Sequence, residues 1–62
     1  MKPPKGFFFI ETFDSRVMLN AACIAIAEEV SPGLCRIGAG PEVIEAYMTL
    51  EQLIEKIKEA QA

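Results

Sequence analysis

Two short runs rich in proline and glycine set the strongest limits on how this chain can fold. They are Ser31-Pro32-Gly33 and Gly38-Ala39-Gly40-Pro41, and both fall near the middle of a chain of 62 residues. Proline lacks an amide hydrogen and clashes with a preceding helical turn, while glycine permits tight reversals. The first run therefore ends the element before it, and the second suits a turn between two strands. Only short elements fit between these runs, and no apolar stretch approaches the ~20 residues that span a bilayer.

The segment before the first run is predicted to hold a strand and then a helix. Residues 7–13 are a block of aromatic and β-branched side chains, which is typical of a strand. Asp14 or Ser15 can accept a hydrogen bond from a free amide of a first helical turn, so we expect a helix from there to Val30. Apolar and small residues also alternate over residues 22–27, which leaves a strand as the alternative for that stretch.

The expected helix is apolar over most of its circumference. Two stripes at helical spacing cover it, and its alanines let a neighbouring backbone approach closely. A helix of this kind is buried on more than one side. In so short a chain the sheet can cover one side, and another subunit is the simplest cover for the other. The residues expected at that subunit interface are Val17, Ala21, Ala22, Ile24 and Ala25.

The middle of the chain is predicted to form a hairpin. Residues 34–37 and 42–47 have the composition of two short strands, joined by the glycine-rich run. Exposed amides of residues 38–40, next to Arg36, would form a small anion-binding nest; the alternative is a plain turn with a solvated arginine. Cys35 and Arg36 are adjacent in a strand, so their side chains are expected on opposite faces.

The last segment has the clearest pattern, that of an amphipathic helix. Thr49 and Gln52 have the spacing of a capping box. The apolar residues that follow at helical spacing are Leu50, Leu53, Ile54 and Ile57. The predicted order is therefore β-α-β-β-α, a single α+β domain of ferredoxin-like type over residues 6–62, with its sheet packed on two helices. Residues 1–5 are expected to be a flexible arm, because two prolines exclude a helix there.

Composition indicates a protein that assembles with itself. Hydrophobic residues make up 52% of the chain, yet a domain of this size buries only about 60% of its unfolded surface. Small domains usually need a disulfide, a metal or a partner subunit. Two cysteines without a recognisable secretory signal fit reduced thiols in a cytoplasmic protein, and the sequence offers no histidine and no Cys-x-x-Cys pair for a metal or another cofactor. A homo-oligomer is therefore expected.

Charge and side-chain chemistry narrow the function further. The formal net charge is −3, with six Lys and Arg residues, which argues against nucleic acid as the main partner. Without histidine the usual near-neutral acid–base group is missing, so an enzyme is not expected. If the protein were an enzyme, the candidate catalytic residues would be Glu11, Asp14 and Cys35. Each also has a structural explanation, as a strand-edge carboxylate, a helix cap and a core residue.

Several short motifs resemble parts of the bacterial microcompartment shell-protein family, the BMC domain. Ile10-Glu11-Thr12 is similar to the Ile-Glu-Thr that ends the family's first strand, and Asn20-Ala21-Ala22 to the Ala-Ala pair of its first helix. Arg36-Ile37-Gly38-Ala39-Gly40 resembles the Lys-Ile-Gly-Ser-Gly loop that faces the central pore of the family's hexamer. Met48-Thr49 falls where the family has the Gly-Asp that starts its second helix.

The resemblance implies a non-enzymatic, self-assembling structural protein. It favours a hexamer with residues 36–40 at a ring axis, where repeated Arg36 side chains would attract small anionic metabolites. The chain departs from the family at Ala27, where an edge lysine would fall, and at Pro41 after the loop; the family domain also continues into a further strand and helix. The alternatives are a small dimeric ligand-binding or regulatory module that completes its sheet across the subunit boundary, and an accessory subunit of an enzyme complex. Neither a membrane nor a nucleic-acid partner is expected.

Overall fold

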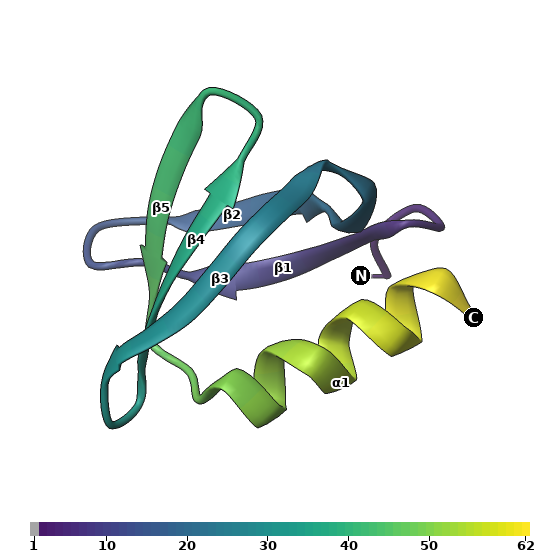
Figure 1. Cartoon of the computed structure of the whole chain (residues 1–62). Coiled ribbons are helices and arrows are strands. Elements are labelled where there is room, and N and C mark those ends of the chain that lie inside the picture. Colours follow the sequence, from purple (N-terminus) through teal and green to yellow (C-terminus); the bar gives the residue numbers. More distant parts are fainter. Residues whose placement is uncertain (1) are drawn as a thin grey trace.

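The computed structural model describes residues 2–62, which form an α+β protein of five strands and one α-helix (Figure 1). In chain order the elements are β1 (Phe7–Glu11), β2 (Arg16–Asn20), the short 3-10 helix η1 (Ala21–Cys23), β3 (Ile24–Ser31), β4 (Leu34–Ala39), β5 (Glu42–Ala46) and α1 (Leu50–Gln61). The predicted α+β class is confirmed. Met1, the first residue of the expected arm, lies outside the described residues, and the flexibility of residues 1–5 stays a prediction.

The strands form two antiparallel sheets. β1 and β2 make a hairpin, while β3, β4 and β5 make a three-stranded meander with β4 in the middle. The hairpin lies across the meander, and α1 runs along one side of both, packed against β1, β3 and η1 (Figure 1). Alternate residues of both sheets face inward and meet the buried face of α1. The resulting core consists of Phe8, Ile10, Leu19, Ala21, Cys35, Ile37, Ala39, Ala46, Met48, Leu53 and Ala60.

Both runs rich in proline and glycine form tight hairpin turns. Pro32-Gly33 joins β3 to β4, and Gly40-Pro41 joins β4 to β5. Gly33 and Gly40 have φ values of +79° and +62°, a region that residues with a Cβ rarely adopt. In the second turn, Gly40 with its positive φ stands at the first loop position and Pro41 at the second. This combination fits a type II′ turn, whose twist suits a hairpin. The predicted turn is therefore confirmed at Gly40-Pro41, although the first two residues of that run belong to β4.

The helix predicted between Asp14 and Val30 is wrong. That stretch holds β2, η1 and β3, so the observed order is five strands followed by one helix instead of β-α-β-β-α. Asp14 and Ser15 lie in the loop of the β1–β2 hairpin, where the Ser15 amide donates to the Thr12 hydroxyl at 3.1 Å. The polar pair therefore shapes a loop and does not cap a helix. Pairing of β2 with the aromatic strand β1 outweighs the helical spacing of the apolar residues.

The alternative reading of residues 22–27 as a strand is confirmed from Ile24 onward. The two residues before it belong to η1, which is capped by the Asn20 side chain as it accepts from the Ala22 amide at 3.0 Å. In a strand, successive side chains point to opposite faces. The register shift between Ile24 and Ile26 interrupts this alternation: Ile24 and Ala27 are half-buried, whereas Ala25 and Ile26 are both exposed, Ile26 by 69%.

The C-terminal helix is confirmed together with its capping box. The Gln52 amide donates to the Thr49 hydroxyl at 3.1 Å, and the Thr49 amide donates to the Gln52 side chain at 2.8 Å. Glu29 of β3 accepts from the Leu50 amide at 2.9 Å and from the Gly33 amide at 3.1 Å, and these hydrogen bonds lower the pKa of its carboxyl. The carboxylate thus ties the start of α1 to the meander. Among residues 2–62 no helix has the length and apolar character needed to cross a bilayer.

Candidate functional site

The segment expected at a ring axis, residues 36–40, lies mostly in β4 and not in a loop. Ile37 and Ala39 point into the core, whereas Arg36 lies on the outer face of the meander. Gly38 is covered by Ile26, whose Cγ2 would lie 2.8 Å from a Cβ atom built at the glycine. The strand predicted over residues 34–37 is thus confirmed and continues to Ala39, so the loop that the resemblance implies at residues 36–40 is wrong for all but Gly40.

The polar groups of this segment already have partners. The Arg36 guanidinium forms an ion pair with Glu45 of β5, with 3.2 Å between Nη2 and Oε2. The Gly40 amide donates to the Cys23 carbonyl at 3.2 Å. An anion nest built from these residues would have to displace both contacts.

The residues expected at a subunit interface are divided among three elements. Val17 in β2 and Ile24 at the start of β3 are half-buried, and Ala21 in η1 belongs to the core. Ala22 and Ala25 are exposed. Because the helical stripe that would join them is absent, the five residues do not form one continuous face.

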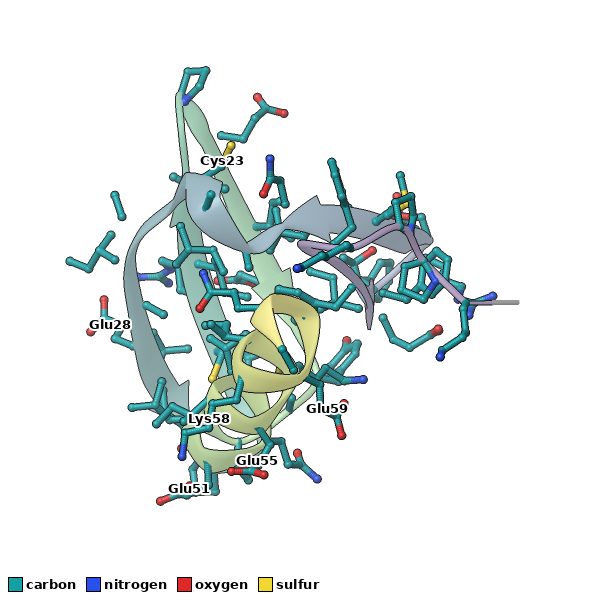
Figure 2. The ribbon with its side chains drawn as sticks, turned by 90° about the vertical axis from the view of Figure 1, so that its right-hand side faces the viewer. Cys23, Glu28, Glu51, Glu55, Lys58 and Glu59 are labelled. Atoms are coloured by element: carbon teal, nitrogen blue, oxygen red, sulfur yellow. The ribbon has the colours of Figure 1, made fainter. Side chains whose placement is uncertain are left out.

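Cys35 does not have the surroundings of a reactive thiol. Its side chain is fully buried in β4, opposite in direction to exposed Arg36 as expected. Burial, and after it the negative charges of Glu29 and Glu51, raises the pKa of the Cys35 thiol. A raised pKa leaves less of the nucleophilic thiolate near neutral pH. Cys23 is exposed on η1, far from Glu51 (Figure 2).

Iodoacetamide is expected to modify Cys23 in the native protein and Cys35 only after unfolding. Access decides the difference, because the Cys35 side chain has no contact with solvent. Peptide mass mapping after labelling with and without urea measures both sites. A Cys23→Ser variant serves as the control and should take up almost no label when folded. Rapid native modification of Cys35 would contradict this assignment.

The two acidic residues considered for catalysis have separate structural contacts. One carboxylate oxygen of Glu11 lies 3.9 Å from Nε of Arg16, and both side chains are largely exposed. Asp14 accepts from the Thr12 hydroxyl at 3.4 Å within the hairpin loop. Across residues 2–62, no three His, Cys, Asp or Glu side chains gather in a way that could hold a metal ion.

A cavity of about 570 Å³ lies between the N-terminal segment, β1 and the last turns of α1. Part of its wall is apolar and comes from Pro3, Pro4, Phe7, Phe8 and Phe9. Another part is cationic and comes from Lys2, Lys5, Arg16 and Lys56. Four of the six Lys and Arg residues of a chain with net charge −3 therefore surround one cavity.

Backbone hydrogen bonds hold the N-terminal segment beside this cavity. The Phe7 amide donates to the Pro4 carbonyl at 3.0 Å, closing a turn in which Gly6 has a φ of +88°. The Gly6 amide donates to the Ala60 carbonyl at 2.8 Å, and the Gly6 carbonyl accepts from the Ala21 amide at 2.8 Å. The turn thus connects the end of α1 with the end of the β1–β2 hairpin.

The cations of the cavity differ in their pairing. The guanidinium carbon of Arg16 lies 4.1 Å from the centre of the Phe9 ring, a cation–π contact, and the same side chain lies near Glu11. Glu59 is the acidic residue of the cavity wall. Within residues 2–62, three cations of the wall form no ion pair: Lys2, Lys5 and Lys56.

Sequence reasoning missed this cavity because its walls come from both ends of the chain. The available signal was the uneven placement of the basic residues, two of which flank the prolines of the first segment. Lys56 has helical neighbours of both charges, so its sequence context resembles that of any surface lysine. Only the packing of α1 beside β1 brings it to the other cations.

The outer edge of β2 is the second feature open to a partner. At one end of the β1–β2 hairpin the Thr12 amide donates to the Ser15 carbonyl, and at the other end the Ala21 amide donates to the Gly6 carbonyl. These two hydrogen-bonded pairs fix which of the residue pairs along the hairpin are hydrogen-bonded. Bonded and non-bonded pairs alternate along an antiparallel ladder. The backbone N–H and C=O groups that point away from β1 are therefore those of Arg16, Met18 and Asn20. Within residues 2–62 no other strand pairs with this edge.

Comparisons of the chain with models of protein families, with curated proteins and with solved structures find no match. The resemblance to the BMC domain stays a prediction. Of its motifs, Ile10-Glu11-Thr12 lies at the end of β1, as the family pattern implies, and Asn20-Ala21-Ala22 enters η1 where the family has a helix.

Proposed function

We propose that the protein is a small, non-enzymatic binding module that acts as a homodimer and completes a sheet across the subunit boundary. The observation that carries the proposal is the open edge of β2. An unpaired strand edge presents a row of backbone donors and acceptors, which another strand can take up. A second copy of the chain is the partner that best fits this edge.

The edge of β2 is less protected than the open edges of β3 and β5 in the other sheet. β3 has two irregularities in its register, and β5 begins directly after Pro41 and carries Glu42 and Glu45. Irregularities, charges and proline all discourage pairing at an edge. β2 has neither proline nor irregularity. Its one charged residue is Arg16, whose side chain is drawn over the Phe9 ring.

The sequence of β2 is compatible with itself in an antiparallel arrangement centred on Met18. In that register Met18 lies opposite its counterpart, and Arg16 lies opposite Asn20 of the other copy. No two like charges face each other, which would weaken the pair. Val17 lies opposite Leu19 on the inner face, so one residue of the interface expected from the sequence takes part. Met18 is 47% exposed in the single chain and would be covered.

Native mass spectrometry, with light scattering as a check, tests the proposal, and a dimer is expected. Met18→Pro should convert it to a folded monomer, because the lost N–H points outward and only the dimer uses it. Val43→Pro is the matched control on β5. Hydrogen-bonded and non-bonded pairs alternate from the Gly40-Pro41 turn, so the Val43 N–H also points away from the neighbouring strand β4. This variant should leave the dimer intact.

Other masses would lead to different conclusions. A hexamer would favour the ring of the shell-type prediction and make Arg36 the next target for mutation. A monomer at all concentrations would contradict the dimer. Circular dichroism of each variant separates loss of the interface from loss of the fold.

A further inference from the structure

The geometry points to the cavity beside β1 as a binding site for a small organic anion that carries an apolar ring. The inference rests on the proposed role as a binding module. It does not require the dimer, because a single chain supplies the lysines and the aromatic side chains of the wall. The two proposals can therefore fail separately.

The charges of the cavity call for an anionic ligand. Lys2, Lys5 and Lys56 approach the same cavity, and no ion pair within residues 2–62 neutralises them. All nine acidic residues of the chain lie within residues 2–62, and among them only Glu59 contributes to this wall. Like charges gathered with little counter-charge repel one another, and a bound anion relieves that repulsion. Lys56 is also half-buried, so solvent screens it less than a freely exposed lysine.

The apolar part of the cavity wall favours a ligand that carries a ring or a similar apolar group. Phe7 and Phe9 are half-buried beside the cavity, and Pro3 and Pro4 extend the apolar surface. The planar guanidinium of Arg16 covers the Phe9 ring and offers a flat cationic surface on which a ligand ring can stack.

Size and composition together narrow the class of ligand. Small-molecule sites typically enclose about 300–1,000 Å³, and this cavity, at about 570 Å³, falls in that range. An inorganic anion would leave the aromatic wall uncovered, and a neutral ring would leave the lysines unpaired. A compound with both parts satisfies both walls.

Fluorescence titration with 8-anilinonaphthalene-1-sulfonate tests the inference, because this compound joins an aromatic ring system to one negative charge. Lys56→Glu and Lys5→Glu are expected to raise its Kd about fivefold or more, as reversal of a nearby charge implies. Lys58→Glu is the matched control, since it makes the same change of charge on the same helix. Lys58 does not line the cavity and projects from a different side of α1 than Glu59 (Figure 2). Its Kd should change by less than about twofold.

Two further measurements locate the binding. The neutral analogue N-phenyl-1-naphthylamine, which lacks the sulfonate, should bind more weakly to the wild-type protein and equally to the three variants. In 15N-labelled protein, the sulfonate should shift the amides of Phe7, Phe9 and Ala60. Equal affinity of Lys56→Glu and Lys58→Glu for the sulfonate, shifts confined to another surface, or no binding would each overturn the site. Native masses of the same variants should remain dimeric, so a monomer that still binds would overturn only the dimer.

Discussion

Replacing Ile37 by alanine is expected to lower the free energy of unfolding by about 2–5 kcal/mol, the range for large-to-small changes in a packed core. Ile37 lies in the central strand of the meander, has no exposed surface and belongs to the core shared by both sheets and α1. The stability of a chain of this length is roughly 3–9 kcal/mol, from about 0.05–0.15 kcal/mol per residue. The change should therefore remove a large part of the total stability, and it unfolds the variant at room temperature where the wild type lies near the lower end of that range.

Ile26→Ala is the matched control for this change. It removes the same atoms from the neighbouring strand β3, but from a side chain that is 69% exposed. Its effect should be about 0.5 kcal/mol or less. Urea denaturation at one fixed protein concentration compares the two variants, since the proposed dimer would make stability depend on concentration. Equal losses for both variants would contradict the core described above.

The sequence predicted those parts of the fold that depend on local chemistry. The capping box of Thr49 and Gln52 forms as expected, because both partners lie within one turn and need nothing else from the fold. The turn at Gly40-Pro41 is also local, since it depends on the positive φ of Gly40 and on the proline that follows it. β4 and β5 were predicted because this turn joins them, and β1 was predicted from its block of aromatic and β-branched residues.

The middle of the first half could not be predicted in the same way. Residues 14–30 have apolar side chains at both helical and alternating positions, so their periodicity does not choose between helix and strand. The choice is made by the aromatic strand β1, which offers β2 a partner. The Thr12 hydroxyl, which accepts from the Ser15 amide, closes the loop that turns the chain back. The pairing of β2 with β1 is not visible in the periodicity of β2 itself, and helical propensity yields to it.

The same limit explains why the candidate site was missed. Arg36 was predicted to bind anions because it stands near two glycines, but in the fold it forms an ion pair with Glu45. No role was predicted for Arg16, although its side chain lines the cavity and its backbone lies on the open edge of β2. A ligand in the cavity and a partner at the edge would therefore contact the same residue. Binding and dimerisation are coupled if either event moves Arg16.

Met18→Lys is expected to separate the dimer. In the register centred on this residue, two lysines would face each other, and the burial of two methionines would be lost. Together these effects should weaken the dimer by about 2–4 kcal/mol, or roughly 30- to 1,000-fold in Kd. Met18→Glu should have the same effect, because two carboxylates would then be opposed. Each variant alone should fold as a monomer, since Met18 is 47% exposed in the single chain.

An equal mixture of Met18→Lys and 15N-labelled Met18→Glu should form a heterodimer, which the isotope label lets native mass spectrometry distinguish by mass from either homodimer. Opposite charges now face each other, and this recovery occurs only if residue 18 of one copy meets residue 18 of the other. Val43→Lys, at a 70% exposed position on β5, is the control and should remain a homodimer. If the mixture stays monomeric while both variants are folded, β2 pairs in another register or does not pair. If Val43→Lys is the variant that dissociates, the interface belongs to β5.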